Sequence, residues 1–366
     1  MGIITLKRGS KRLHIHNIEV RLTQKLNNHA KAFVTGMLYS EIENSYLEST
    51  TANSEFTVEY EEEGADSEVL FTGLCLAMRN ESEGLGENAV YYVEVELIAF
   101  TYLMDIQKVR RSFQNHQMSY DDLLAAINRD QNASVHGSVA SGAQTGAFIL
   151  QYDETNWEFL KRMLSKFKGV LIGDYIHNRP RYKFGLVGTA NHGDIEEYTY
   201  TITRDFTAFR SVTKNQQLSH VSDRDYRIFT VTVEGDEPEI FSAGDRMTVK
   251  NQKLHIEEVE TIIKDYRFLT TYTLKTAQGL RQVPYNNSQI VGVSLIGTVI
   301  DVADNVLKVH LHLDDDQDVG EATWFRYATL YSNWYCMPEK GDLVNLYLPS
   351  EKESQAIVIN SIKNLA

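Results

Sequence analysis

The stretch that decides the fold is WFRYATLYSNWYCMPEKGDLVNLYLP, Trp324–Pro349, which contains a Gly-Asp pair between two strand-like runs. It holds two of the chain's three tryptophans and one of its two cysteines. Period-two alternation places Trp324 and Arg326 on one face of a strand and Phe325 and Tyr327 on the other. Such an aromatic cluster can line a sugar site, stack on nucleic acid or fill a core, and the rest of the chain must decide which.

The same alternation recurs along most of the chain. SEFTVEY (Ser54–Tyr60) and YYVEVELIAF (Tyr91–Phe100) alternate apolar residues with threonine or glutamate, and YRIFTVTVEG, LHIEEVETI and FLTTYTLKT repeat the pattern. The apolar face of the first run carries Phe56, Val58 and Tyr60. Period two with β-branched and aromatic residues predicts half-buried antiparallel strands, so the fold class is mainly β.

Two segments are predicted to be helices. In SYDDLLAAIN, Ser119 is the expected N-cap, and two aspartates follow in the first turn, where acids suit the helix dipole. In DETNWEFLKRMLSKFKG, Thr155 and Glu158 form a capping box, and Gly169 is expected to close the helix. One apolar stripe at helical spacing is expected to face the core: Trp157, Leu160, Leu164 and Phe167.

Two short stretches share a Gly-Asp pair directly before a strand: SAGDRMTV (Ser242–Val249) and PEKGDLVNL (Pro338–Leu346). We expect the glycine to adopt the positive φ that tightens a turn and the aspartate to bond the backbone of the residues after it. Each pair would then mark a strand that enters a small barrel.

Composition excludes several classes of function. Lys plus Arg number 36 and Asp plus Glu 50 in 366 residues, a formal charge of −14, which argues against nonspecific duplex binding and against adhesion to anionic membranes. The two cysteines, Cys75 and Cys336, give no disulfide framework. MGIITLKRGSKRLHIHN has no apolar core typical of a signal peptide, and no run is long enough to span a membrane. We therefore expect synthesis in the cytoplasm and no integral membrane association.

Candidate chemistry is sparse. His14 and His16 are expected on one face of a strand, and so are His310 and His312, which an aspartate run follows. H-x-H on a strand is a geometry that metals use, but neither pair has a third ligand at firm spacing, so we interpret both as structural. Carboxylates such as Glu61–Glu63 and Asp194–Glu197 lie in charge-rich stretches that would not raise a pKa. We predict no catalytic, cofactor-binding or metal-binding residues and no cofactor.

The last part of the chain resembles the OB-type barrel of tail-spike and VgrG proteins. GTVIDVADNVLKVHLHLD is similar to that family's first hairpin. The next run matches its W-x-R strand, aromatic segment, P-x-x-G-D-x-V turn and closing strand at Trp324, Arg326, Tyr331, Pro338, Gly341, Asp342, Val344 and Ala356–Ile359. Ser332-Asn333 stands where the family usually has alanine-glycine.

Upstream, the chain resembles the phage late control gene D family. The run that follows the TG strand matches at Asp105, Arg111, Ser112, Phe113 and Gln114, and the Q-Y-x-E-x-D-x-x-F-L helix matches at Gln151, Tyr152, Glu154, Phe159 and Leu160, with Asn156 for the usual aspartate. The resemblance implies two antiparallel β-barrel hub domains with a small helical connector, plus a C-terminal OB-fold barrel. We predict a first hub barrel at 1-115, a connector at 116-184, a second hub barrel at 185-285 and an OB-fold spike base at 290-366.

The resemblance implies a structural baseplate hub of a contractile tail or injection system, without enzymatic activity. The expected partners are two further copies in a homotrimer, the sixfold tail tube, a threefold spike or needle tip supplied by a separate protein since this sequence ends at Ala366, and other baseplate proteins. The expected location is the assembled tail particle. The aromatic cluster is then barrel core and trimer contact. Acidic residues outnumber Lys308, Arg326 and Lys340 around it, which argues against nucleic-acid binding. A tail-associated cell-wall hydrolase and a carbohydrate-binding module remain the alternatives.

Overall fold

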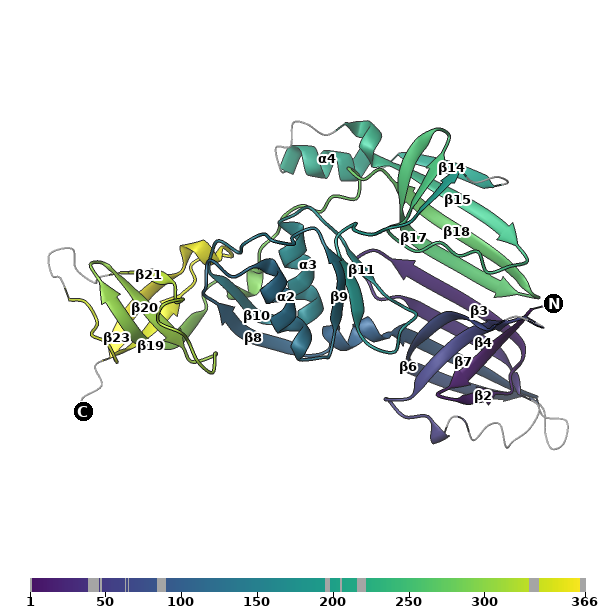
Figure 1. Ribbon diagram of the computed structural model, residues 1–366, viewed down its shortest axis with the longest axis horizontal. Helices are drawn as coiled ribbons and strands as arrows, with labels where there is room; N and C mark the ends of the chain where they lie inside the picture. The colour runs from purple at the N-terminus through teal and green to yellow at the C-terminus, as the bar shows by residue number, and fades with distance from the viewer. Residues whose placement is uncertain are drawn as a thin grey trace. The chain divides into compact units, whose positions relative to one another are not determined.

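The computed structural model describes residues 2–38, 46, 48–62, 64, 66–83, 90–194, 198–204, 206–215, 222–328 and 336–362. The chain divides into two compact units. The first contains Met1–Leu103, Gln131–Val139 and Lys168–Val283, and the second contains Met104–Asp130, Ala140–Phe167 and Pro284–Ala366. The fold is mainly β with antiparallel sheets, as predicted (Figure 1).

One 13-stranded sheet dominates the first unit. Its strands are β1 (Ile3–Arg8), β2 (Lys11–Leu13), β3 (His16–Lys25), β4 (Lys31–Leu38), β5 (Glu55–Glu61), β6 (Glu68–Glu83), β7 (Val90–Ala99), β13 (Asn191–Asp194), β14 (Thr199–Arg204), β15 (Arg227–Gly235), β16 (Arg246–Val249), β17 (Gln252–Lys264) and β18 (Arg267–Lys275). A small sheet of β11 (Leu171–Gly173), β12 (Arg181–Phe184) and β9 (Ser134–Ser138) and the helices η3 (Asp223–Tyr226) and α4 (Phe206–Asn215) complete the unit. The helix η2 (Phe100–Asp105) lies where the chain passes into the second unit.

The large sheet contains the same strand arrangement twice. Its main path runs β14-β15-β18-β17-β3-β4-β7-β6-β5, and β16 pairs with β17 as β5 pairs with β6. In chain order, β3 to β7 therefore repeat as β14 to β18 (Figure 1). A β-bulge follows Cys75 in β6 and Ile256 in β17, the same place in each copy. Because β17 pairs with β3, the two copies join end to end within one chain.

Each copy of the repeat has its own core. In the first, Phe56, Val58 and Tyr60 point inward as their alternation predicted, and they pack in one cluster with Val95 and Leu97. A second cluster, around Phe229, Met247, Ile256 and Leu274, belongs to β15 to β18. Alternating burial along each strand leaves the opposite face of the sheet accessible to solvent.

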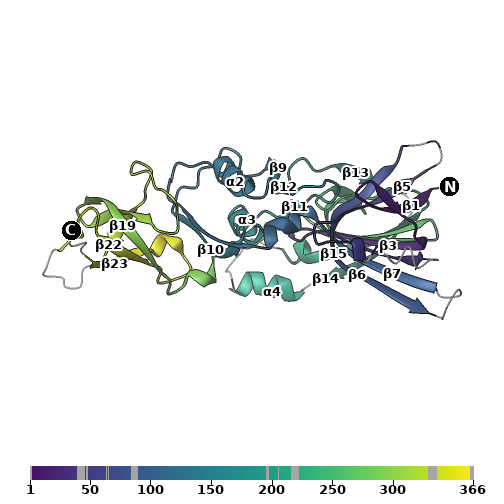
Figure 2. The same cartoon turned by 90° about the horizontal axis from the view of Figure 1, so that it is seen from below.

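The second unit combines a pair of strands, two helices and a closed barrel. The pair is β8 (Lys108–Phe113) with β10 (Ile149–Thr155), the helices are α2 (Tyr120–Arg129) and α3 (Asn156–Ser165), and the barrel strands are β19 (Ser294–Ala303), β20 (Val306–Leu311), β21 (Trp324–Tyr327), β22 (Leu343–Tyr347) and β23 (Ile357–Ile362), with η4 (Ser288–Ile290) and η5 (Glu353–Gln355) beside them (Figure 2). The barrel closes in the order β19-β20-β21-β23-β22. The OB-fold assignment and the predicted domain bounds stay predictions.

Both helix starts are confirmed. The Ser119 side chain accepts a bond from the Asp122 N–H, and Thr155 and Glu158 form the reciprocal capping box. The predicted end is wrong, because α3 stops at Ser165 and the left-handed conformation falls on Lys168 at φ +56° instead of Gly169. Bonds from the N–H groups of residues 166 and 167 to carbonyls three residues back tighten the last turn and end the helix early.

Helix α3 is buried on more sides than a single stripe provides. Trp157, Leu160 and Leu164 are fully buried, whereas Phe167 is half-buried and packs edge-on against Tyr120, 4.8 Å between ring centroids. The side chains of Phe159, Arg162 and Met163 are also buried. The predicted stripe of Trp157, Leu160, Leu164 and Phe167 did not include these three positions.

The two Gly-Asp turns share one geometry. Gly341 has φ +97° and Gly244 has φ +93°, as their role in a turn requires. Asp342 Oδ2 accepts from the Glu339 N–H at 2.8 Å, and Asp245 Oδ2 accepts from the Ser242 N–H at 3.3 Å. In both bonds the aspartate side chain reaches back three residues, not forward as expected. A strand, β22 or β16, begins directly after each turn.

Candidate functional site

The residues of the two upstream motifs meet where β8 pairs with β10. Arg111 donates from Nε to Gln151 Oε1 at 2.8 Å and from Nη2 to Asn156 Oδ1 at 2.7 Å. A third bond runs from its Nη1 to Asp130 Oδ2 at 2.8 Å. Burial lowers the pKa of Arg111, and the Asp130 carboxylate opposes that effect. The rigid fork of the guanidinium thereby fastens the end of α2, strand β10 and the start of α3 to one another.

Other motif residues support the same junction. Phe113 stacks on Phe159 of α3 with 6.0 Å between ring centroids. Asp105 accepts a hydrogen bond from the hydroxyl of Thr155, the residue that caps α3. The motif residues thus set the position of α3 on the β8–β10 pair.

Ser112 and Gln114 attach this layer to the barrel of the same unit. The Ser112 N–H and hydroxyl both donate to Asp314, at 2.8 and 2.5 Å. The buried Gln114 amide donates to Val309 O at 3.0 Å and accepts from the Thr323 N–H at 3.1 Å. Burial raises the pKa of Asp314, and the two bonds from Ser112 oppose the rise. Asp314, from the aspartate run that follows His312, is therefore an anchor between β8 and the segment after β20.

A buried ion cluster forms the other tie. Arg162 of α3 is 0% exposed, and it donates twice to Glu154 and once to Glu353 of η5, each at 2.7 Å. Its remaining bond goes to Leu150 O at 2.8 Å. Burial raises the pKa of Glu154, and the bonds from Arg162 counteract it. Sequence reasoning missed Arg162 and Glu353, because an i,i+8 pair and a residue nearly 200 positions away leave no local signal.

We call these contacts of Asp105, Arg111, Ser112, Gln114, Gln151, Glu154, Arg162, Asp314 and Glu353 the barrel joint. The polar side chains of the barrel joint bond to one another and to the backbone, and these bonds hold two layers together. Tyr331, Ser332 and Asn333, which carry part of the barrel resemblance, lie outside the described residues.

The predicted faces of the opening stretch are confirmed. Phe325 is 4% exposed in the barrel core and packs edge-on against Phe148, 5.1 Å between centroids. Trp324 is 42% exposed on the outer face, where Lys308 Nζ lies 4.9 Å from its ring centroid. Within the described part of this stretch, Phe325 therefore belongs to the core and Trp324 to the surface.

The two histidine pairs are placed differently. His310 of β20 bonds Asp314 O at 3.0 Å, and His312 just beyond the strand bonds Thr298 Oγ1 at 2.9 Å. The prediction that each pair shares one strand is wrong, because β2 ends at Leu13 and β3 begins at His16, and because β20 ends at Leu311, before His312. Within the described part of the chain, no group of three or more His, Cys, Asp or Glu side chains is placed to hold a metal ion.

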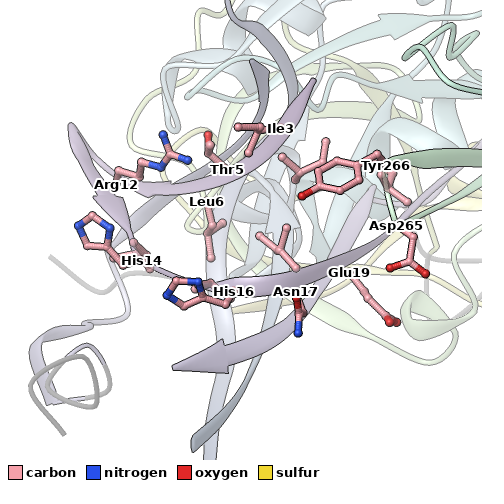
Figure 3. A pocket seen from close by; sticks show the side chains of 15 residues that line it. Ile3, Thr5, Leu6, Arg12, His14, His16, Asn17, Glu19, Asp265 and Tyr266 are labelled. Carbon is pink, nitrogen blue, oxygen red and sulfur yellow. The ribbon is translucent and has the colours of Figure 1, made fainter. Parts of the chain in front are cut away.

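A cavity of about 460 Å³ lies beside His14 and His16 in the first unit. Figure 3 shows the two rings at one end and Asp265 and Tyr266, from the turn between β17 and β18, at the other. Of the carboxylates considered as catalytic acids, Glu61 is ion-paired with Lys7 and Arg12, both at 3.2 Å. Glu63, Glu196 and Glu197 lie outside the described residues.

The fold defined by the repeated sheet and the barrel is that of a phage tail protein and of a component of the type VI secretion system, and it is shared with a chain of a PdpA–VgrG complex. The Escherichia coli c3393 protein, a component of the type VI secretion system with structural similarity to the T4 tail proteins gp27 and gp5, superposes with TM-score 0.64 and 12% identity over 98% of this chain and 99% of that one. A chain of a Francisella PdpA–VgrG complex gives TM-score 0.61 and 10% identity over 100% of this chain and 72% of that one. The 43 kDa tail protein of prophage MuSo2 from Shewanella oneidensis gives 0.56 and 12% over 77% and 98%.

No family model matches the sequence, and no curated protein matches it either. At 10–12% identity, the likeness to solved structures establishes the fold, and it confirms at that level the resemblance that the motifs indicated. Among the described residues, no helix has the length and apolarity that a membrane crossing requires.

Proposed function

We propose that this chain is the structural hub of a contractile tail or injection system, a homotrimeric adaptor between a sixfold tail tube and a threefold spike. The observation that carries the proposal is the fold match over both units, which covers 98% of this chain and 99% of a type VI secretion component. The hub has no enzymatic role in this proposal. Its partners are the tube, a separate spike tip and other baseplate proteins, and it ends in the assembled particle.

The repeated sheet supports the adaptor role. Each chain presents the five-strand arrangement twice, so a trimer presents it six times around one axis. A surface with six similar elements can match a sixfold tube, while the single barrel of each chain keeps threefold symmetry for the spike.

The joint between the two copies of the repeat also suggests how chains join. Within a chain, β17 beyond its bulge pairs with β3, the first strand of the other copy. By the repeat, β6 corresponds to β17 and β14 corresponds to β3. The equivalent pairing between two chains would therefore join β6 beyond its bulge to β14 of the next chain. In the described residues, β6 beyond Leu74 pairs only with β7, and β14 pairs only with β15. Tyr200 and Ile202, on the core side of β14, are 42% and 43% exposed at this edge, as expected of a core face that another strand completes.

The repeat predicts the register of this pairing. Arg21 lies in one row with Phe33, Glu96 and Ala77, and Thr201 lies in the corresponding row that ends at Glu258. The pairing of Ile262 with Arg21 inside the chain therefore corresponds to Glu81 with Thr201 between chains. Because the two strands are antiparallel, Arg79, two residues before Glu81, faces Thr203, two residues after Thr201.

Mass photometry and cysteine cross-linking test the proposal together. We expect a trimer at micromolar concentration. In a background with Cys75 and Cys336 changed to serine, Arg79→Cys with Thr203→Cys should form disulfide-linked species up to the trimer, because opposed residues have Cβ atoms about 5 Å apart. The matched control, Arg79→Cys with Thr199→Cys, is shifted by four residues, about 13 Å, and should not. A monomer, or equal cross-linking by both variants, contradicts the proposal.

A further inference from the structure

The accessible face of the large sheet has an unusual charge pattern. We define the paired-charge face as one face of the large sheet, the face that points away from the two hydrophobic cores. It is formed by strands β15, β18, β3, β4, β7 and β6 and by β17 from Glu258 onward. Rows rich in threonine run across this face. One row consists of Thr232, Thr271, Glu260 and Thr23, in that order across neighbouring strands. Leu269, Ile262 and Phe33 lie in one row on the same face, with Arg21 between Ile262 and Phe33.

Each lysine and arginine that the described strands carry on this face lies against a carboxylate. Lys25 Nζ lies 2.7 Å from Glu258, Lys31 Nζ lies 2.9 Å from Glu96, and Arg21 pairs with Glu260. The other pairs are Lys264–Glu19 at 2.5 Å, Arg267–Glu234 at 3.0 Å, Lys275–Glu257 at 2.8 Å and Arg79–Glu81 at 3.2 Å. Most of them join neighbouring strands.

Protein stability is a weak explanation for the pairing of every described lysine and arginine on this face with a carboxylate. The side chains in the pairs of Arg21, Lys25 and Lys31 are 33–60% exposed, and exposed ion pairs contribute between nothing and about 1 kcal/mol each. The electrostatic consequence is larger, because a cation held by a carboxylate cannot neutralise a phosphate without first losing its partner. Nonspecific binding of nucleic acid depends on that neutralisation.

We propose that the paired-charge face is a surface that does not retain polyanions, with nucleic acid as the relevant class, because its cations are neutralised by their strand neighbours. The inference rests on the proposed function in one respect: strand pairing between chains would extend this face around the assembly, so that cargo passes a continuous surface. Net acidity alone is a different explanation, since it would repel polyanions whichever carboxylates were present.

The test frees three cations without changing their positions. The variant Glu96→Gln, Glu258→Gln, Glu260→Gln releases Lys31, Lys25 and Arg21 from charged partners and keeps the side-chain shapes. The matched control, Asp315→Asn, Asp316→Asn, Glu321→Gln, removes the same charge from exposed residues of the barrel unit. Binding of a fluorescent DNA duplex is measured by anisotropy at several salt concentrations.

We expect no binding by the unaltered chain or the control. The face variant should bind duplex with a Kd in the nonspecific range of about 10⁻⁴ to 10⁻⁶ M, and log K should fall against log salt with a slope near −2.7, about −0.9 for each freed cation. Should the triple variant not fold, Glu258→Gln with Glu260→Gln should give a slope near −1.8. Binding by the unaltered chain, or equal behaviour of variant and control, overturns the inference. The assay is independent of assembly state, so a monomeric chain would refute the hub and leave this result standing.

Discussion

Replacing Arg162 by methionine tests the buried ion cluster of the barrel joint. The guanidinium is fully buried and donates to both carboxylates and to Leu150 O. Methionine fills much of the same volume but leaves Glu154 and Glu353, each 7% exposed, without a cation. Removing one partner of a buried ion pair costs about 3–5 kcal/mol, since the remaining charge stays desolvated. We therefore expect Arg162→Met to lower the free energy of unfolding of the second unit by about that amount near neutral pH.

The loss should depend on pH in a defined direction. Burial raises the pKa of Glu154 in the unaltered chain, and the bonds from Arg162 oppose the rise. Without Arg162 that opposition is gone, so the pKa of Glu154 in the folded state rises further above its value in the unfolded chain. A carboxyl with a raised folded-state pKa favours folding while it is protonated, and this contribution is lost as the pH rises through that pKa. The deficit of Arg162→Met should thus be smallest in acid and largest above neutrality.

We would measure the unfolding free energy of the second unit from hydrogen exchange of the α3 amides in urea. The measurement is made at about pH 5 and again at about pH 8. The matched control is Arg110→Met, which removes an exposed arginine bonded to Asp153 at 2.8 and 3.1 Å on the same strand pair. Its loss should be much smaller because solvent screens the pair. The reasoning is refuted if the two variants lose equal stability at the higher pH, or if the deficit of Arg162→Met does not change with pH.

Three further substitutions address the turn, the helix and the barrel attachment. Gly341→Val should lower the unfolding free energy by about 1–3 kcal/mol through backbone strain alone, because no atom would crowd the new Cβ; an unchanged melting temperature would show that the turn does not need glycine. Leu160→Ala, at a fully buried position, should cost about 2–5 kcal/mol and Thr155→Ala about 1 kcal/mol; the reverse order in urea unfolding would mean that α3 is held by its cap. Gln114→Leu should cost about 1–3 kcal/mol because Val309 O and the Thr323 N–H lose their buried partner; equal stability would show that water replaces the amide.

Local patterns predicted the elements well. Strand alternation identified the inward side chains Phe56, Val58 and Tyr60, and the two cap motifs identified the starts of α2 and α3. Each signal succeeds because a few neighbouring residues contain all the information that the local geometry uses. The predicted end of α3 was wrong because it depends on more than neighbouring residues. The last turn of the helix tightens inside a packed layer, and the sequence near Gly169 contains no information about that packing.

The repeat could not be read from the sequence. Corresponding rows of the two copies carry unlike residues, Arg21, Phe33 and Glu96 in one and Thr201, Thr230 and Thr273 in the other. Solvent-facing positions on a sheet accept almost any polar residue, so two similar arrangements of strands need not have similar residues at corresponding positions. Only the ladders, with a bulge at Cys75 and another at Ile256, reveal the correspondence.

The upstream motifs that carried the late control gene D resemblance contribute most of the barrel joint, and packing chemistry explains why. An apolar core position accepts several side chains of similar volume, so the cores of the large sheet leave no short motif. A buried polar contact is more demanding: the Arg111 guanidinium must reach the buried side chains of Gln151 and Asn156, and replacing Arg111 leaves both of their oxygens without that donor. Residue identity is therefore most constrained where polar groups are buried between layers. The upstream motifs therefore mark the joint between helices and barrel, whereas the alternation along the strands of the large sheet predicts strands without specifying the fold.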